Sequence, residues 1–199
     1  IRLGARLRRL LRMPLAGLLG CASAFAAEPL QAERVSDTAW FVQGDMALGS
    51  TANRNFISNA GFVVTPQGVV VIDALGSPAL AEELIATIRK VTAQPIRYLI
   101  VTHYHADHVY GLQAFQAAGA TVIAQRAGLA YLNSETATRR LAASREELFP
   151  WIDEHTRLVP ADRWLIIEKG VFKDYQTTRE QVARIQKLTG VNRSHGCSF

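Results

Sequence analysis

The sequence predicts an α/β layered fold, because strand-like and helix-like segments alternate along it. Short runs of β-branched apolar residues are followed by amphipathic segments whose apolar side chains recur at helical spacing. The 199 residues are 49% hydrophobic and 20% charged, which is ordinary for a globular chain. This composition excludes a disordered or collagen-like protein, and the length favours one domain or two small ones.

The first strands are expected to include a hairpin. A strand-like run at 40–42 is followed by the polar, glycine-containing residues 45–55, which we expect to form a loop. The β-branched runs 62–64 and 69–72 are joined by Thr65-Pro66-Gln67-Gly68, whose proline and glycine suit a tight turn.

Helices and strands alternate after the hairpin. Ser77 and Pro78 are the N-cap and first-turn proline of a helix whose apolar residues keep helical spacing up to Val91. Pro95 ends this helix, and 96–101 is a continuous apolar strand of the kind that is buried between helix layers. We expect a helix at 112–118, a strand at 121–124 and a mostly helical segment at 129–148. A strand and turn at 166–170 and an amphipathic helix at 178–188 follow.

The first 26 residues predict a secretory signal peptide. An arginine-rich start precedes the apolar run 13–26, which ends in the small-x-small sequence Ala24-Phe25-Ala26. This run is too short to span a bilayer, so we expect cleavage before Ala27 and a periplasmic protein. Two alternatives stay open. The segment can be an amphipathic surface helix, or Leu18-Leu19-Gly20-Cys21 can be a lipoprotein box that leaves Cys21 as a lipid anchor.

The net positive charge of the chain comes from this predicted signal peptide. Five of the 22 basic residues lie in 1–26 and none of the 17 acidic residues does, so the rest of the chain carries equal numbers of each sign. The net charge of +5 therefore leaves no basic surface for nucleic acid. Cleavage would leave Cys197 alone, without an internal disulfide.

Three of the five histidines lie within six residues, in the sequence His103-Tyr104-His105-Ala106-Asp107-His108. They directly follow an apolar strand, and α/β folds bind ligands at the carboxyl ends of strands. Imidazole and carboxylate are ligands that zinc accepts. In an extended loop, His103 and His105 project to one side and grip an ion, while Asp107 and His108 can turn toward a second one about 3.5–4 Å away. The alternative is a chance run of surface histidines.

The pattern H-x-H-x-D-H after an apolar strand, with the preceding segments 59–64 and 69–73, resembles the metallo-β-lactamase superfamily. Residues from about 30 to 165 are similar to its quinoprotein relay system or SoxH-like zinc hydrolases. The resemblance implies an αββα sandwich and two zinc ions, with His103 and His105 at the first and Asp107 and His108 at the second. It also implies that Asp73 orients the metal loop, although a carboxylate that caps a turn at a strand end is the alternative.

The resemblance covers only the first half of the family's pattern. A complete site also takes a histidine, a bridging aspartate and another histidine, whereas only His155 and His195 remain here. We interpret His155 as a surface residue. Residues 166–199 are similar to an interior segment of TldD/PmbA metallopeptidases, although that family's H-E-x-x-x-H zinc helix is absent from the sequence.

We therefore divide the chain into a signal peptide (1–26), the truncated first half of a metallo-β-lactamase-like domain (27–165) and an unrelated β-α segment (166–199). This division makes the protein a chimera, with a divergent hydrolase tail as the alternative.

These inferences predict a periplasmic zinc hydrolase that attacks an ester, thioester or amide carbonyl of a small-molecule substrate, with Asp107 handling the proton. A non-catalytic half-domain or fusion product that binds metal weakly is the alternative. Because the family's second sheet is largely missing, we expect the inner face of the first sheet to remain partly exposed, including Val70, Ile72, Leu99 and Val101. The chain would then associate or be only marginally stable.

Overall fold

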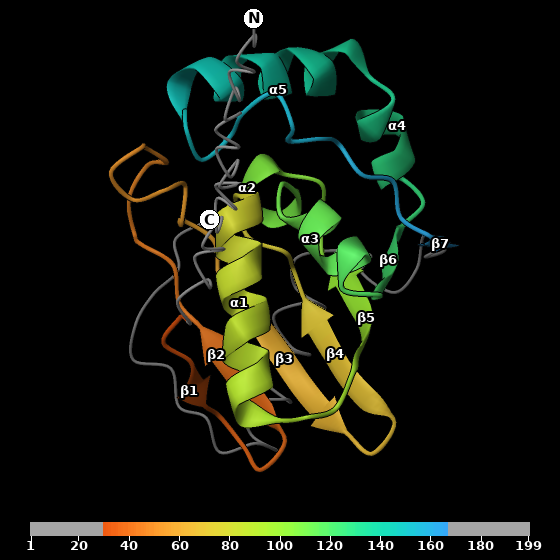
Figure 1. Cartoon of the computed structure of the whole chain (residues 1–199). Helices are drawn as coiled ribbons and strands as arrows, with labels where there is room; N and C mark the ends of the chain where they lie inside the picture. The colour runs from red at the N-terminus through yellow and green to blue at the C-terminus, as the bar shows by residue number, and fades with distance from the viewer. Residues whose placement is uncertain (1–29, 167–199) are drawn as a thin grey trace, which may run out of the picture.

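The computed structural model describes residues 30–166, which form one seven-stranded sheet with helices (Figure 1). The order of the strands in the sheet equals their order in the sequence. The first four pair antiparallel, and β4 to β7 pair parallel. The strands are β1 (Glu33–Arg34), β2 (Ala39–Val42), β3 (Ala60–Thr65), β4 (Gly68–Ile72), β5 (Ile96–Val101), β6 (Thr121–Gln125) and β7 (Arg163–Leu165). The predicted α/β class is confirmed.

Five helices connect or flank these strands: α1 (Pro78–Val91), α2 (Ala106–Val109), α3 (Leu112–Ala117), α4 (Gly128–Leu132) and α5 (Glu135–Glu147). The predicted start of α1 is confirmed, since Ser77 Oγ accepts a hydrogen bond from Leu80 N and Pro78 occupies the first turn. The helical segment expected at 129–148 is two helices, because Ser134 begins α5 by accepting a hydrogen bond from Ala137 N. Both lie beyond the end of the sheet toward which the parallel strands point (Figure 1).

The predicted hairpin is also confirmed. β3 and β4 are joined by the two residues Pro66 and Gln67, and Thr65 pairs with Gly68 across the turn. Gly68 has a φ of +134°, a backbone conformation that other residues rarely adopt. This turn fixes the antiparallel register of β3 and β4, and β4 then ends at Ile72, directly before Asp73.

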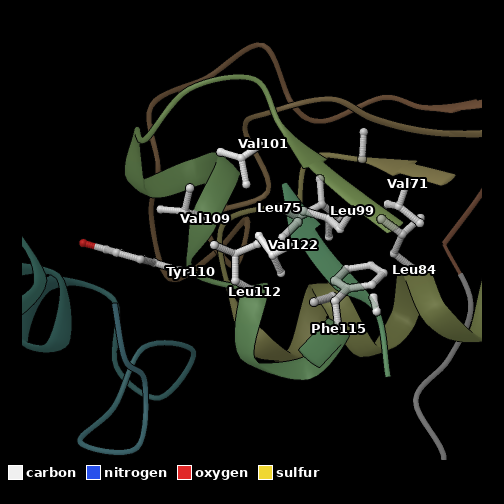
Figure 2. Close-up of a cluster of buried hydrophobic side chains, with 14 of the residues drawn as sticks. Val71, Leu75, Leu84, Leu99, Val101, Val109, Tyr110, Leu112, Phe115 and Val122 are labelled. Atoms are coloured by element: carbon white, nitrogen blue, oxygen red, sulfur yellow. The ribbon is translucent and has the colours of Figure 1, made fainter. Parts of the chain in front are cut away.

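One face of the sheet is fully covered by α1 and α3. Leu99 and Val101 of β5 are 0% and 3% exposed, and they pack with side chains from both helices, such as Leu84 and Phe115. Figure 2 shows this layer, in which Val71, Leu99 and Val122 of three neighbouring strands face Leu112 and Phe115 of α3. This face is the hydrophobic core of the described part of the chain.

The opposite face is partly open. Tyr98 and Ile100 are each 38% exposed, and Val70 and Ile72 are half-buried. The expectation of partial exposure therefore holds for Val70 and Ile72 but is wrong for Leu99 and Val101. Leu99 pairs with Val71 and shares its face, whereas Val70 and Ile72 alternate to the other face. The interpretation of 96–101 as a strand buried on both faces is wrong for the same reason.

Sequence reasoning missed the two edge strands. β1 and β7 contain two and three residues and carry no alternating apolar pattern, so their pairing depends on the neighbours β2 and β6. The predicted signal peptide, the helix at 178–188, Cys197 and His195 lie outside the described residues. None of the helices within 30–166 has the length and apolar character needed to cross a membrane.

Candidate functional site

The histidine-rich segment lies at the carboxyl end of β5. Thr102 to His105 form a loop, and α2 begins directly after it, with His105 as its N-cap residue in an extended conformation. His108 N donates to His105 O at 3.0 Å, which folds the segment back on itself. His105 is extended, as expected, and the chain turns into α2 from Ala106 onward, so that Asp107 and His108 lie on a helical turn.

This turn brings the three imidazole rings together. The ring centroid of His103 is 4.5 Å from that of His105 and 4.2 Å from that of His108. Asp107 Oδ2 lies 3.3 Å from His108 Nε2. The structure thus places all four sequence-predicted ligands at one edge of the sheet, with His108 beside His103 and not in a separate group.

Asp73 connects this segment to the end of β4. Its buried carboxylate accepts hydrogen bonds from Thr102 N at 2.8 Å through Oδ1 and from Thr102 Oγ1 at 2.7 Å through Oδ2. The same Oδ2 is 2.8 Å from His108 Nδ1. One carboxylate therefore holds both the start of the loop and the last histidine, an arrangement that leaves Nε2 of His108 free to face Asp107.

The backbone around Asp73 is unusual. Asp73 and Leu75 have φ values of +62° and +64°, which only a tightly supported segment maintains. Two hydrogen bonds provide that support: Asp73 N donates to Ile100 O at 2.9 Å, and Ala74 N donates to His108 O at 2.9 Å. This conformation directs the Asp73 carboxylate toward the histidine segment. The unusual backbone directly after β4 therefore positions the carboxylate that bonds Thr102 and His108.

The charges of the site are strongly coupled. Burial lowers the pKa of His108, but the hydrogen bonds to Asp107 and Asp73 outweigh it and raise this pKa to about 9. Burial raises the pKa of Asp107, but the hydrogen bond and positive charge of His108 lower it below the usual range. Burial, together with His108 and His105, lowers the pKa of His103. The two carboxylates beside His108 therefore favour its protonated form.

The donor types of this cluster fit zinc, which prefers imidazole nitrogen and carboxylate oxygen. The arrangement is less complete. Across 30–166, no group of three or more His, Cys, Asp or Glu side chains is placed so that it could hold an ion. A structural zinc site takes four protein ligands and a catalytic one three. The described residues therefore supply suitable donors but not a closed metal site.

Two contributors escaped the sequence analysis. Thr102 bonds Asp73 and also lies with its Oγ1 3.0 Å from His103 Nδ1. Ser58, from the loop before β3, donates its hydroxyl to Asp107 O. Thr102 could have been found from the sequence, because it lies directly between the β5 strand and the first histidine. Ser58 could not, because it is 49 residues from Asp107 and only the fold brings the two together. His155 is remote and its side chain is 80% exposed, as expected.

Comparisons with known proteins agree with this architecture. A family model described as the metallo-beta-lactamase superfamily matches residues 53–178, which include β3, β4 and the whole histidine segment. The linear primary-alkylsulfatase of Pseudomonas sp. (strain ATCC 19151) is 32% identical over 53 residues, which are 27% of this chain and 10% of that protein.

The chain is also similar to parts of solved structures. A motif mutant of a metallo-beta-lactamase from Cronobacter sakazakii is 27% identical with a TM-score of 0.44, over 68% of this chain and 47% of that one. The metallo-beta-lactamase from Hirschia baltica is 20% identical with a TM-score of 0.45, over 71% and 54%. The chain thus spans about half the length of these structures and a tenth of the alkylsulfatase.

Proposed function

Because the chain belongs to the metallo-β-lactamase superfamily, we propose that it is a periplasmic zinc-dependent hydrolase of an ester, thioester or amide carbonyl in a small molecule. The proteins to which the chain is similar are hydrolases, and they include β-lactamases and an alkylsulfatase. The observation that carries the proposal is the family match across the histidine segment at the carboxyl end of β5.

The roles of the residues follow the family assignment. His103 and His105 would hold a first zinc ion, and Asp107 and His108 a second. Bound zinc supplies Lewis acidity and water that ionises near neutral pH. Asp73 is a positioning residue, because its carboxylate bonds Thr102 and His108 and so fixes the direction of the histidine segment. Asp107 would accept a proton through one of its carboxylate oxygens.

Metal binding is the first test. We expect fewer than two tightly held zinc ions per chain, since the four candidate ligands cannot complete two sites that each need three or four. The double substitution His103→Ala and His105→Ala should abolish this binding, measured by elemental analysis after dialysis. His155→Ala is the matched control, because its exposed imidazole lies outside the cluster. Undiminished zinc in the double variant would disprove the metal site.

Hydrolysis is the second test. The purified chain, loaded with zinc, would be offered a thioester, a β-lactam, a carboxylic ester and, because one relative is an alkylsulfatase, an alkyl sulfate. Zinc-dependent turnover that is lost on chelation and in the His103→Ala, His105→Ala variant supports the proposal. Turnover that survives both treatments contradicts it.

A second candidate is a non-catalytic half-domain or fusion product that binds metal weakly. The absence of a closed group of three ligands within 30–166 favours it. Reading the encoding DNA beyond codon 165 would separate the two. Continuation into a glycine-rich segment with His, Asp and His would mark residues 166–199 as foreign to the domain.

We also propose export, based on the arginine-rich start and the end at Ala26. Mass spectrometry of periplasmic protein should find a mature N terminus at Ala27, or a lipid on Cys21 as the alternative. An intact leader on periplasmic protein would contradict both.

A further inference from the structure

A cavity of about 310 Å³ lies beside the histidine segment. It is formed where the loop after β5 meets the loop after β6 and the start of α4. Its lining includes His103 and His105 together with Val101, Tyr104, Ala127 and Tyr131. The volume is at the lower end of the range of about 300–1,000 Å³ that is typical of small-molecule pockets.

The wall of this cavity is held in place by packing. Tyr104 is 7% exposed and stacks on Trp164 of β7, with ring centroids 5.9 Å apart and an interplanar angle of 22°. Gly128 lies against one edge of the same ring, since a Cβ at this position would lie 2.5 Å from Tyr104 Cδ2 and 2.9 Å from Tyr104 Cε2. The absence of a side chain at Gly128 therefore allows the tyrosine ring and α4 to approach closely and shape the wall.

The lining is mostly apolar and aromatic. No Asp, Glu, Lys or Arg is among the residues that line the cavity, and its polar side chains other than the histidines and tyrosines are Thr102 and Gln125. A mostly apolar and aromatic wall stabilises hydrocarbon by removing it from water. His103 and His105, to which the proposed function assigns a zinc ion, belong to the same lining.

We propose that this cavity is the subsite for the hydrocarbon part of the substrate, an acyl or alkyl chain whose reacting group lies at His103 and His105. The inference rests on the proposed function of that site. It assigns Val101, Tyr104 and Tyr131 to substrate selection and makes chain length the property that the enzyme discriminates.

The test measures binding without turnover. The affinity of the purified, zinc-loaded chain for acetate, butanoate, hexanoate and octanoate is determined by isothermal titration calorimetry. Burial of a methylene is worth about fourfold in affinity, so we expect the dissociation constant to fall by up to that factor for each added methylene. An affinity that is independent of chain length overturns the inference.

Two blocking variants locate the effect. Ala127→Phe and Gln125→Phe each place a ring in the cavity from an exposed position, so neither requires the core to repack. Ala93→Phe and Gln94→Phe are the matched controls, because these exposed residues lie in the loop before β5, at the opposite end of that strand. Thermal melts verify that each variant folds.

We expect the chain-length dependence to disappear in at least one folded blocking variant and to persist in both controls. Persistence in all folded blocking variants overturns the inference. The proposed function and the subsite can fail independently. If binding depends on chain length but no zinc-dependent turnover is found, the proposed function is wrong and the subsite stands. If turnover is found but binding does not depend on chain length, only the subsite is wrong.

Discussion

The two faces of the sheet differ although the same strands build both. In β5, Leu99 is completely buried under α1 and α3, while the next residue, Ile100, is 38% exposed on the other side. Both side chains are apolar and both lie in the middle of the sheet. Apolar, β-branched residues favour a strand here, but the position of the helices determines which of its two faces becomes core.

The open face is itself apolar. Val70, Ile72, Tyr98, Ile100 and Ile123 lie on it across three neighbouring strands, and all are half-buried or exposed. Contiguous apolar surface of this kind is characteristic of contact surfaces and also favours aggregation. We therefore expect substitutions on the covered face to change mainly stability, and substitutions on the open face to change mainly self-association.

The largest effect is expected for truncation on the covered face. Leu99→Ala should lower the free energy of unfolding by about 3 kcal/mol, because it leaves a cavity beneath α1 and α3. Ile100→Ala should cost roughly 1 kcal/mol, since its side chain already meets solvent. Urea unfolding of both variants checks this difference. Equal losses would mean that the two faces are packed alike.

Two glycines differ in the space around their Cα atoms. Gly111, between α2 and α3, has no room for a side chain: a Cβ would lie 2.0 Å from Ala74 O and 2.6 Å from Ala81 Cβ. Gly111→Ala should therefore cost about 2 kcal/mol through overpacking. Gly61→Ala, on the open face, meets only Trp40 O at 3.2 Å and should change stability by less than about 0.5 kcal/mol. A larger loss for Gly61→Ala in the same unfolding assay would contradict this ranking.

The smallest effect on stability, and a clear one on association, is expected for polar changes on the open face. The double substitution Ile100→Thr and Ile123→Thr keeps β-branched residues in β5 and β6, so we expect a loss of about 1 kcal/mol or less. Self-association, measured by sedimentation velocity over a range of concentrations, should weaken. Val91→Thr on α1 is the control, because Val91 is similarly exposed at 37% but lies away from this face. Unchanged association in the double variant would show that the open face does not cause it.

Much of the fold could be predicted because local signals agreed with the tertiary structure. Ser77 and Pro78 begin α1, and Gly68 closes the hairpin, as the chemistry of a cap and of a turn requires. The break between α4 and α5 was missed, since Ser134 lies within a sequence that has acceptable helical character on both sides. The edge strands β1 and β7 were missed because two or three residues carry too little pattern.

The candidate site divides in the same way. The identity of the donors and their place after β5 follow from the sequence alone, because chemistry and chain order are local properties. Their geometry does not: the turn into α2 brings His108 to within 4.2 Å of the His103 ring, and Asp73 fixes it from a separate strand. The cavity beside them needs Tyr104, Gly128 and Trp164 to meet, which are far apart in the chain.

The donor chemistry, the strands β2 to β6 and the principal helices could be predicted without the fold, since they depend on residue type and short-range periodicity. The packing of the helices makes Leu99 a core residue and leaves Ile100 at the surface, because neighbouring apolar side chains of one strand differ in burial only when helices cover one face. The tertiary structure likewise determines that Asp73 holds both ends of the histidine segment, because hydrogen bonds between residues 29 and 35 positions apart form only after β4 and β5 pair.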